Sequence, residues 1–206
     1  FMTFDDTTVK ILSGKSDFTL TLIGLETFVD VQFAKSDLKI NLDSLNLKQI
    51  IRKTSFAISN SESRPVLGGI SLSTNKNMLQ VCATDGYRLA RKQIMFENEF
   101  PLLKIVVPGK SVDALNKIID ESTENIEIYC SSSSVLFKFK NILFQSRLID
   151  GVYPPVNKLI PNEYIGSVEF NKEELINTID RVALFATTDA TNIINFSMSS
   201  NGYVEF

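Results

Sequence analysis

The sequence predicts an α+β fold in which antiparallel strand pairs alternate with amphipathic helices. Segments of alternating polar and apolar residues occur in pairs around short polar turns. Three segments with helical spacing of apolar residues interrupt these pairs, and two of the helical segments introduce similar units. The chain has 206 residues, which is enough to build one or two domains with a sizeable core.

The strand pairs are predicted from period-two alternation on either side of a turn rich in polar residues. They comprise residues 9–12 with 18–22, 70–72 with 79–82, and 126–128 with 135–139. Ile142, Phe144 and Ser146 begin one more strand. Antiparallel sheets are therefore expected.

The three helices are predicted from capping residues followed by apolar side chains at helical spacing. The first is capped by Asp43 or Ser44 and is expected to continue to about Ile58. Ser111 opens the second helix, and Asn171 caps the third as part of a capping box. The apolar positions are Leu47, Ile50, Ile51, Thr54 and Phe56 in the first, Val112, Leu115, Ile118 and Ile119 in the second, and Leu175, Ile179, Val182 and Phe185 in the third.

Composition excludes several kinds of site. The chain has no histidine, which removes the commonest general base and transition-metal ligand. Zinc-type cysteine spacing and a phosphate-binding glycine loop are also missing from the sequence. Cys82 and Cys130 fall at inward-facing strand positions, so buried free thiols are expected instead of a disulfide. No catalytic residue, metal or cofactor is predicted.

Charge and hydropathy narrow the class of protein further. The net charge of −3 argues against a protein that holds nucleic acid by bulk charge alone, although it permits a local basic face. Apolar runs fall short of the roughly 20 residues of a membrane span, and the N-terminal residues do not resemble a secretory signal.

Internal similarity predicts tandem domains of one fold. The segments 47–59 and 175–187 resemble each other, and strand 70–72 matches residues 196–198. The second copy extends barely one hairpin, residues 1–30 look like the last strands of a preceding copy, and the chain begins with Phe1 instead of Met. We therefore expect a fragment with the end of a first domain (1–35), a complete middle domain (36–164) and the start of a third (165–206).

Three motifs occur in a characteristic order. The most informative runs from Ala83 to Ala90, where Thr84 and Asp85 can bond the backbone of a tight turn and Gly86 can supply a left-handed conformation. Segment 63–70 precedes it, and segment 148–154, followed by Leu-Ile-Pro at 159–161, comes after it. Together these motifs resemble those of the bacterial replicative sliding clamps, the β subunits of DNA polymerase III, over nearly the whole chain.

This resemblance implies a DNA-clamp fold with antiparallel sheets outside and helices lining a ring. Clamps of this family are non-enzymatic homodimers that encircle duplex DNA, slide along it and tether the replicative polymerase. The polymerase, the clamp loader and repair proteins dock through short linear motifs in one peptide-binding pocket of the clamp. A cytoplasmic location, associated with the nucleoid during replication, is implied as well. An acidic protein can act on DNA in this way because enclosure, and not tight contact, retains it.

The resemblance and the helical spacing suggest basic residues that face DNA. Residues four or seven apart lie on one side of a helix, so Lys48 and Arg52 share a face. The predicted DNA-facing residues are Lys48, Arg52, Lys53, Lys110, Lys117, Lys172 and Arg181. An ordinary solvated helix surface explains most such lysines in proteins, and the resemblance favours a weak DNA-facing role here. Gly109 stands where some relatives carry another basic residue.

The resemblance also implies a partner-peptide pocket between the middle and third domains. Its lining, carried over by motif, comprises Arg64, Leu67, Thr84, Gly86, Tyr87, Arg88, Leu89, Pro154, Lys158 and Leu159. The apolar members would form the floor, and the two arginines would donate to peptide carbonyls or a carboxylate. Leu67, Leu89 and Leu159 can alternatively be ordinary core residues.

Two positions depart from the family pattern. Tyr87 stands where histidine is frequent, although both side chains offer a flat ring with a polar group. Lys158 stands where arginine is frequent, which keeps the charge but loses the forked geometry.

Two other functions remain open from the residues alone. A peptide-binding adaptor would use the same pocket without forming a ring. A hydrolase or transferase would use Asp85 with another carboxylate such as Asp150, but both aspartates precede glycine, as in ordinary turns.

Overall fold

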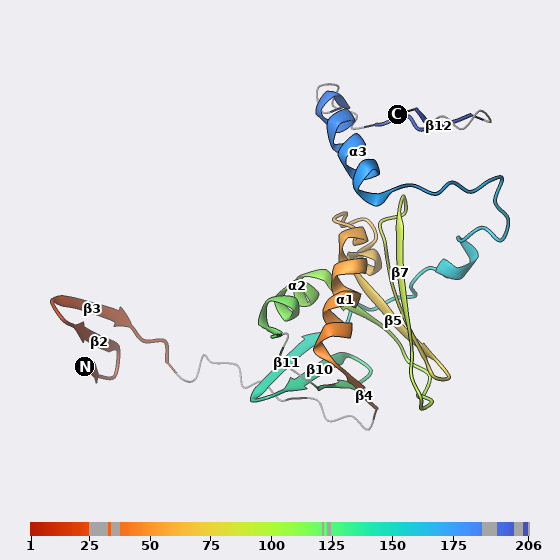
Figure 1. Cartoon of the computed structure of the whole chain (residues 1–206). Coiled ribbons are helices and arrows are strands. Elements are labelled where there is room, and N and C mark those ends of the chain that lie inside the picture. Colours follow the sequence, from red (N-terminus) through yellow and green to blue (C-terminus); the bar gives the residue numbers. More distant parts are fainter. Residues whose placement is uncertain are drawn as a thin grey trace. The chain divides into compact units, whose positions relative to one another are not determined.

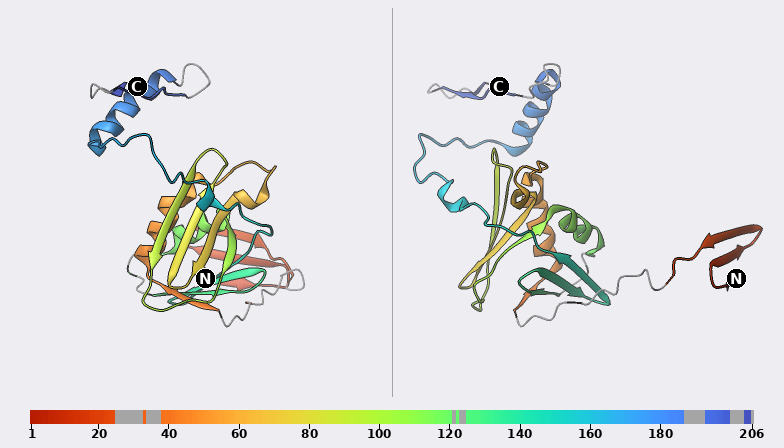
Figure 2. Two further views of the ribbon diagram at one scale, coloured as in Figure 1. Left: turned by 90° about the vertical axis from the view of Figure 1, so that its right-hand side faces the viewer. Right: turned by 180° about the vertical axis from the view of Figure 1, so that it is seen from behind.

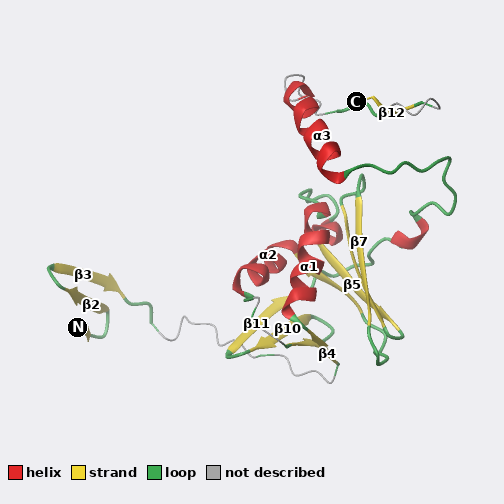
Figure 3. Ribbon diagram, viewed as in Figure 1, coloured by secondary structure: helices red, strands yellow, loops and turns green. Residues whose placement is uncertain are grey.

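A computed structural model describes residues 1–24, 33, 38–120, 122, 125–186, 193–199 and 204–205 of the chain (Figure 1). The chain divides into two compact units, Phe1–Val156 and Asn157–Phe206, and each is described by itself. Helices and antiparallel strands both contribute (Figure 3), as the sequence predicts. The domain limits proposed from the sequence stay predictions.

The main body of the larger unit contains two helices and eight strands in its described part. Its elements are β4 (Lys39–Leu42), α1 (Ser44–Thr54), β5 (Gly69–Asn75), β6 (Met78–Thr84), β7 (Leu89–Met95), β8 (Lys104–Pro108), α2 (Gly109–Ile118), β9 (Ile126–Cys130), β10 (Ser134–Phe139) and β11 (Ile142–Arg147). Short 3₁₀ helices are η2 (Ser55–Ala57) and η3 (Pro65–Gly68), and η4 (Val156–Lys158) starts at the end of this unit.

The strands form two four-stranded antiparallel sheets, ordered β11-β10-β9-β4 and β7-β6-β5-β8. Helices α1 and α2 lie in the angle between the sheets, which two further views also show (Figure 2). The predicted hairpins are confirmed, since β5 pairs with β6 and β9 pairs with β10. This arrangement leaves one face of each helix outside the core.

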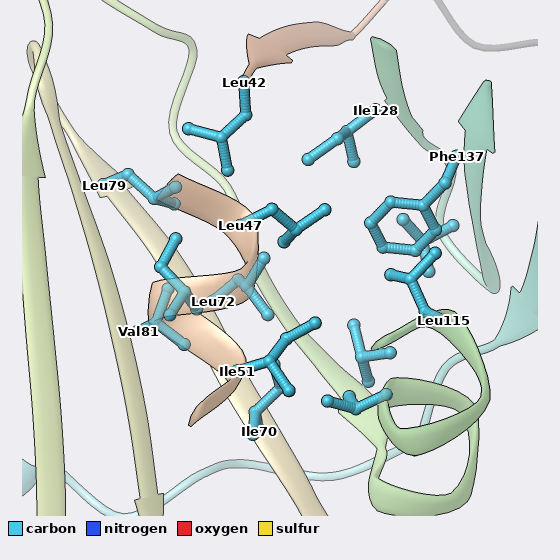
Figure 4. Packing of buried hydrophobic residues seen from close by; sticks show 14 of the residues in the cluster. Leu42, Leu47, Ile51, Ile70, Leu72, Leu79, Val81, Leu115, Ile128 and Phe137 are labelled. Carbon is cyan, nitrogen blue, oxygen red and sulfur yellow. The ribbon is translucent and has the colours of Figure 1, made fainter. Parts of the chain in front are cut away.

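The core fills the space between the sheets and the helices. Leu47 and Ile51 of α1 and Leu115 of α2 point toward side chains of both sheets, among them Leu79 and Phe137 (Figure 4). These side chains are all at least 97% buried. Burial of large aliphatic side chains contributes about 1.5–3 kcal/mol each, so this cluster is the main stabilising feature of the unit.

Helix α1 begins as predicted and ends earlier than predicted. The Asp43 carboxylate accepts the Asn46 backbone N–H at 2.7 Å and caps the first turn. The helix stops at Thr54, whose hydroxyl donates to the Ile50 carbonyl at 2.8 Å, and continues as η2. The change of helix type turns Phe56 outward, leaving its side chain 58% exposed instead of in the predicted apolar stripe.

Helix α2 begins two residues before the predicted start at Ser111. Strand β8 passes directly through Pro108 into Gly109, the first helical residue. The Ser111 hydroxyl accepts a hydrogen bond from the Ser146 hydroxyl at 2.7 Å, so it is used in a contact with β11 instead of in capping. At the other end Ile119 is buried, whereas Ile118 is 39% exposed.

The N-terminal residues form a three-stranded antiparallel sheet of β1 (Met2–Phe4), β2 (Thr8–Ser13) and β3 (Ser16–Thr21). The predicted hairpin around residues 13–16 is confirmed, with Gly14 in a left-handed conformation at a φ of +59°. Strand β1 was not predicted.

The smaller unit contains α3 (Lys172–Ala186) and the strand pair β12 (Ser197–Met198) and β13 (Val204–Glu205). The predicted cap is confirmed, because the Asn171 side-chain oxygen accepts the N–H groups of Glu173 and Glu174 at 2.9 and 3.2 Å. The apolar face predicted for α3 is largely exposed, with Phe185 77% exposed.

Both cysteines are buried thiols that form no disulfide within the described residues, as the sequence predicts. Burial raises the pKa of Cys82 to about 11 and that of Cys130 to about 12, so both thiols are protonated at neutral pH. Within the part of the chain that the structure describes, no helix combines the length and apolar character needed to cross a membrane.

Candidate functional site

The turn from Thr84 to Arg88, which joins β6 to β7, is held by its own side chains. The Thr84 hydroxyl donates to the Arg88 carbonyl at 2.7 Å and accepts the Gly86 N–H at 3.1 Å. One Asp85 carboxylate oxygen accepts the N–H groups of Tyr87 and Arg88 at 2.9 and 3.0 Å. Gly86 has a φ of +97°. The turn chemistry predicted from the sequence is confirmed, and it leaves the Tyr87 side chain 99% exposed.

The Arg88 guanidinium is fixed on two sides. Its Nε donates to the second Asp85 oxygen at 2.9 Å, and its guanidinium carbon lies 5.9 Å from the centre of the Phe56 ring. The Arg88 and Tyr87 N–H groups, which donate to Asp85, lower the pKa of its carboxyl group to about 2. Asp85 is therefore ionised at neutral pH, with both oxygens occupied, which suits turn capping and not proton transfer.

Arg64 lies against the turn at Gly86. A Cβ atom built on Gly86 would be 3.1 Å from the Arg64 Nη2 atom, so the guanidinium packs against the glycine. Arg64 is exposed, and no salt bridge to it is found within the described ranges. The turn thus lies next to two arginines, Arg88, which a carboxylate holds, and Arg64, for which the described residues supply no carboxylate partner.

A third segment, residues 149–156, crosses next to this turn; we call it the crossing segment. The Ile149 N–H donates to the Val106 carbonyl of β8 at 2.9 Å, and Val156 is buried. Between these points the Tyr153 hydroxyl accepts the Thr84 N–H at 3.0 Å. Burial raises the pKa of Tyr153 to about 12, so the hydroxyl is protonated over the physiological range.

The structure brings several predicted pocket residues together. Arg64, the turn 84–88 and the crossing segment, which carries Pro154, are adjacent in the larger unit. We call this group the turn corner. Leu89 and Pro154 are half-buried there.

The remaining predicted pocket residues are placed differently. Leu67 is 1% exposed and belongs to the interior. Lys158 and Leu159 lie in the smaller unit, where both are exposed. The assignment of these residues to a pocket stays a prediction.

Two residues that contact the turn 84–88 do so in ways that sequence reasoning did not anticipate. Phe56 was assigned to a helix face but meets Arg88, and Tyr153 was part of a motif without a role of its own. A half-buried tyrosine hydroxyl needs a hydrogen-bond partner, but the half-burial of Tyr153 is seen only in the structure, so no signal for this contact was present in the sequence.

A hollow next to Arg88 extends to the N-terminus of α2. Its lining combines two cations with two carboxylates and several serines, so it has no net charge preference. The residues are Ser55, Phe56, Ile58, Ser59, Asn60, Ser61, Glu62, Pro65, Gly68, Arg88, Gly109, Lys110 and Asp113.

The predicted DNA-facing residues occupy three helices. Arg52 and Lys53 of α1 and Lys110 and Lys117 of α2 are exposed, and they make no ion pair with any residue that the structure describes. We call these four residues the basic helix faces. Lys48 on α1 is half-buried.

The basic residues of α3 belong to the smaller unit. Lys172 is exposed, and the Arg181 Nε donates to the Asn177 carbonyl at 3.2 Å. Their assignment to a DNA-facing surface stays a prediction, as does that of the basic helix faces.

Comparison with known proteins gives consistent matches. The family model for the DNA polymerase III beta subunit, central domain, matches residues 41–155. The beta sliding clamp of Staphylococcus epidermidis is 37% identical over 195 residues, which is 95% of this chain and 52% of that protein. The beta sliding clamp of Halalkalibacterium halodurans is 34% identical over 204 residues, covering 98% of this chain and 54% of that protein. The chain thus spans about half the length of the curated relatives it matches.

Solved structures give the same result. The DNA polymerase sliding clamp of Bacillus subtilis superposes with a TM-score of 0.83 at 34% identity, covering 89% of this chain and 49% of that chain. The DNA polymerase III beta chain of Streptococcus pneumoniae superposes with a TM-score of 0.87 at 27% identity, covering 99% of this chain and 58% of that chain. The α+β clamp fold predicted from the sequence is therefore confirmed.

Proposed function

The chain belongs to the DNA polymerase III beta subunit family, and we propose from this premise that it is part of a processivity factor. The complete protein would encircle duplex DNA as a homodimeric ring of three similar domains per subunit. It would tether the replicative polymerase and other replication and repair proteins without catalysing a reaction, in the cytoplasm. The observation that carries this proposal is the 37% identity to a beta sliding clamp over 95% of the chain.

The basic helix faces support a sliding contact with DNA. Their side chains are exposed and have no ion-pair partners within the described ranges, so they are available to phosphates. Phosphate contacts of this kind carry no sequence information and weaken steeply with salt. A few such contacts would centre the duplex without stopping its movement, while enclosure keeps a protein of net charge −3 on DNA.

The turn corner supports recognition of a peptide. It combines the exposed Tyr87 ring, the apolar Leu89 and Pro154, and the guanidinium groups of Arg64 and Arg88. An apolar surface beside cations fits a short motif of apolar residues that also carries a carboxylate. The carboxylate would pair with Arg64, because Arg88 is already engaged by Asp85.

Topological retention is tested by opening the DNA. The protein is loaded by its clamp loader on a nicked circular duplex, and the circle is then cut once with a restriction enzyme. We expect release within minutes, because a ring slides off a free end. The control is the same linear DNA with a bulky protein block at each end, on which the ring should remain.

The same experiment separates the ring from an adaptor that does not enclose DNA. Protein that stays on the linear DNA with free ends would contradict enclosure. Protein that never accumulates on the circle but still binds a partner peptide would favour the adaptor, which the names of the relatives do not support.

A further inference from the structure

We propose that Tyr153 is a positioning residue, whose hydroxyl holds the turn 84–88 in its binding-competent conformation and couples that turn to the crossing segment. The inference rests on the proposed partner-binding role of the turn corner. The Tyr153 hydroxyl accepts the backbone N–H of Thr84, at the start of that turn.

The hydrogen bond acts at the start of the turn. Thr84 is 4% exposed and is the last residue of β6, paired with Leu89 of β7. Its N–H donates to the Tyr153 hydroxyl, while its own hydroxyl closes the turn on Arg88. A buried N–H without an acceptor is costly, so the position of the Tyr153 oxygen determines where the Thr84 backbone can lie.

The crossing segment holds Tyr153 in place from both sides. Ile149 is bonded to β8 upstream, and Val156 is buried downstream. Gly151, at a φ of +129°, lies against Val66, with 3.5 Å from its ideal Cβ position to a Val66 methyl carbon. The tyrosine is thus fixed by contacts that do not involve the turn, which allows it to act as a support.

The same bond connects two walls of the corner. Pro154 follows Tyr153 directly, whereas Tyr87 and Arg88 follow Thr84 by three and four residues. Loss of the hydroxyl frees the Thr84 amide, so the turn is no longer held in position relative to Pro154. A peptide that touches both walls would then have to order them on binding, which lowers its affinity.

The experiment compares two Tyr→Phe variants of the purified protein. Tyr153→Phe removes the acceptor of the Thr84 N–H, and Tyr129→Phe removes a hydroxyl that donates to Glu127 at 3.0 Å on the other sheet. The probe is a fluorescent pentapeptide of sequence Gly-Leu-Asp-Leu-Phe, followed by anisotropy. We expect about five- to tenfold weaker binding for Tyr153→Phe and no change for Tyr129→Phe.

Two further measurements separate positioning from general stability. Hydrogen exchange without peptide should be faster at residues 84–88 in Tyr153→Phe only. In a double-mutant cycle, the loss of affinity for Tyr153→Phe combined with Arg88→Ala should be smaller than the sum of the two single losses, because Tyr153→Phe acts in part through the position of Arg88.

The outcomes are distinct. Equal affinities and equal exchange for both tyrosine variants overturn the positioning role, and so do additive losses in the cycle. If the unmodified protein does not bind the peptide and Arg88→Ala changes nothing, the partner-binding proposal fails, and faster exchange at 84–88 would then support positioning of the turn alone.

Discussion

The turn corner and the basic helix faces both present cations to solvent, but they hold them in opposite ways. Arg88 is fixed by an ion pair to Asp85 and by the Phe56 ring, on a turn that is itself closed by hydrogen bonds. Arg52, Lys53, Lys110 and Lys117 make no ion pair within the ranges that the structure describes. The turn of the turn corner is preorganised for binding, whereas the side chains of the basic helix faces are not.

This difference matches the two tasks proposed for the molecule. A turn that is already closed by hydrogen bonds loses little conformational entropy when a peptide binds, which favours recognition of one peptide geometry, and Arg64 beside it remains available to a carboxylate. Long side chains that are not held in place can follow phosphates as a duplex moves past, at a small gain for each contact. Substitutions in the two regions should therefore affect different measurements.

Gly86→Ala is expected to have the largest effect on peptide binding. A φ of +97° is strained for alanine, and its Cβ would lie 3.1 Å from the Arg64 guanidinium. The turn should change shape and displace Arg64, which should weaken peptide binding by about five- to thirtyfold in anisotropy titrations, because about 1–2 kcal/mol of backbone strain is involved.

A matched control is available in the β2–β3 turn. Gly14→Ala also places alanine at a positive φ, +59°, and no atom lies within 4 Å of the Cβ position. It should leave peptide affinity unchanged. If both glycine variants bind the peptide with the affinity of the unmodified protein, the turn corner is not preorganised for peptide binding.

Arg88→Ala and Leu89→Ala should each weaken binding of the same peptide by about five- to tenfold. Arg88→Ala leaves Asp85 without its ion pair and uncovers Phe56, and Leu89→Ala removes apolar surface from the corner. Titration calorimetry measures both. Retention on circular DNA should be unaffected, and an equal loss of retention would mean that the two regions are not separate.

Lys110→Ala should have a smaller effect, and on DNA only. It removes one exposed cation, so we expect clamp loading that is about two- to threefold slower and a salt dependence of DNA binding reduced by about one unit of slope. Peptide affinity should stay the same. Lys104→Ala, at an exposed position on strand β8, is the control for loss of one positive charge. A change of peptide affinity in Lys110→Ala that Lys104→Ala does not share would contradict the separation of the sites.

The smallest effect concerns pH. The pKa of Asp85 is lowered in the folded state from 3.8 to about 2, so its ionised form stabilises the fold above the unfolded pKa, and this contribution is lost as the pH falls through about 2. The difference in free energy of unfolding between the unmodified protein and Asp85→Asn should be constant from about pH 8 to about pH 5 and decrease below about pH 4.

Urea titrations at each pH measure that difference. Asp5→Asn is the matched control, because Asp5 caps a similar turn through the N–H groups of Thr7 and Thr8 and its pKa is also lowered to about 2. Both variants should show the pH dependence, but only Asp85→Asn should weaken peptide binding. If the difference in free energy of unfolding grows as the pH falls from about 5 to about 3, the lowered pKa of Asp85 is contradicted.

The sequence by itself determined the local parts of this structure. The cap at Asp43, the cap at Asn171 and the turn of Thr84, Asp85 and Gly86 were predicted and found, because each depends on side chains within about four residues of the backbone groups they bond. The hairpins followed for the same reason, since alternation and a short turn determine their register. The clamp fold was predicted from the family resemblance of three motifs, at residues 63–70, 83–90 and 148–154.

Only the tertiary structure decided which distant groups meet at the turn corner. Tyr153 and Thr84 are separated by 69 positions, and Phe56 reaches Arg88 because α1 changes to a 3₁₀ helix before it. Likewise, Ser111 lost its expected capping role to a hydroxyl of β11. Periodicity and turn chemistry describe neighbours along the chain, whereas these contacts depend on how sheets and helices pack, which is set by the whole core at once.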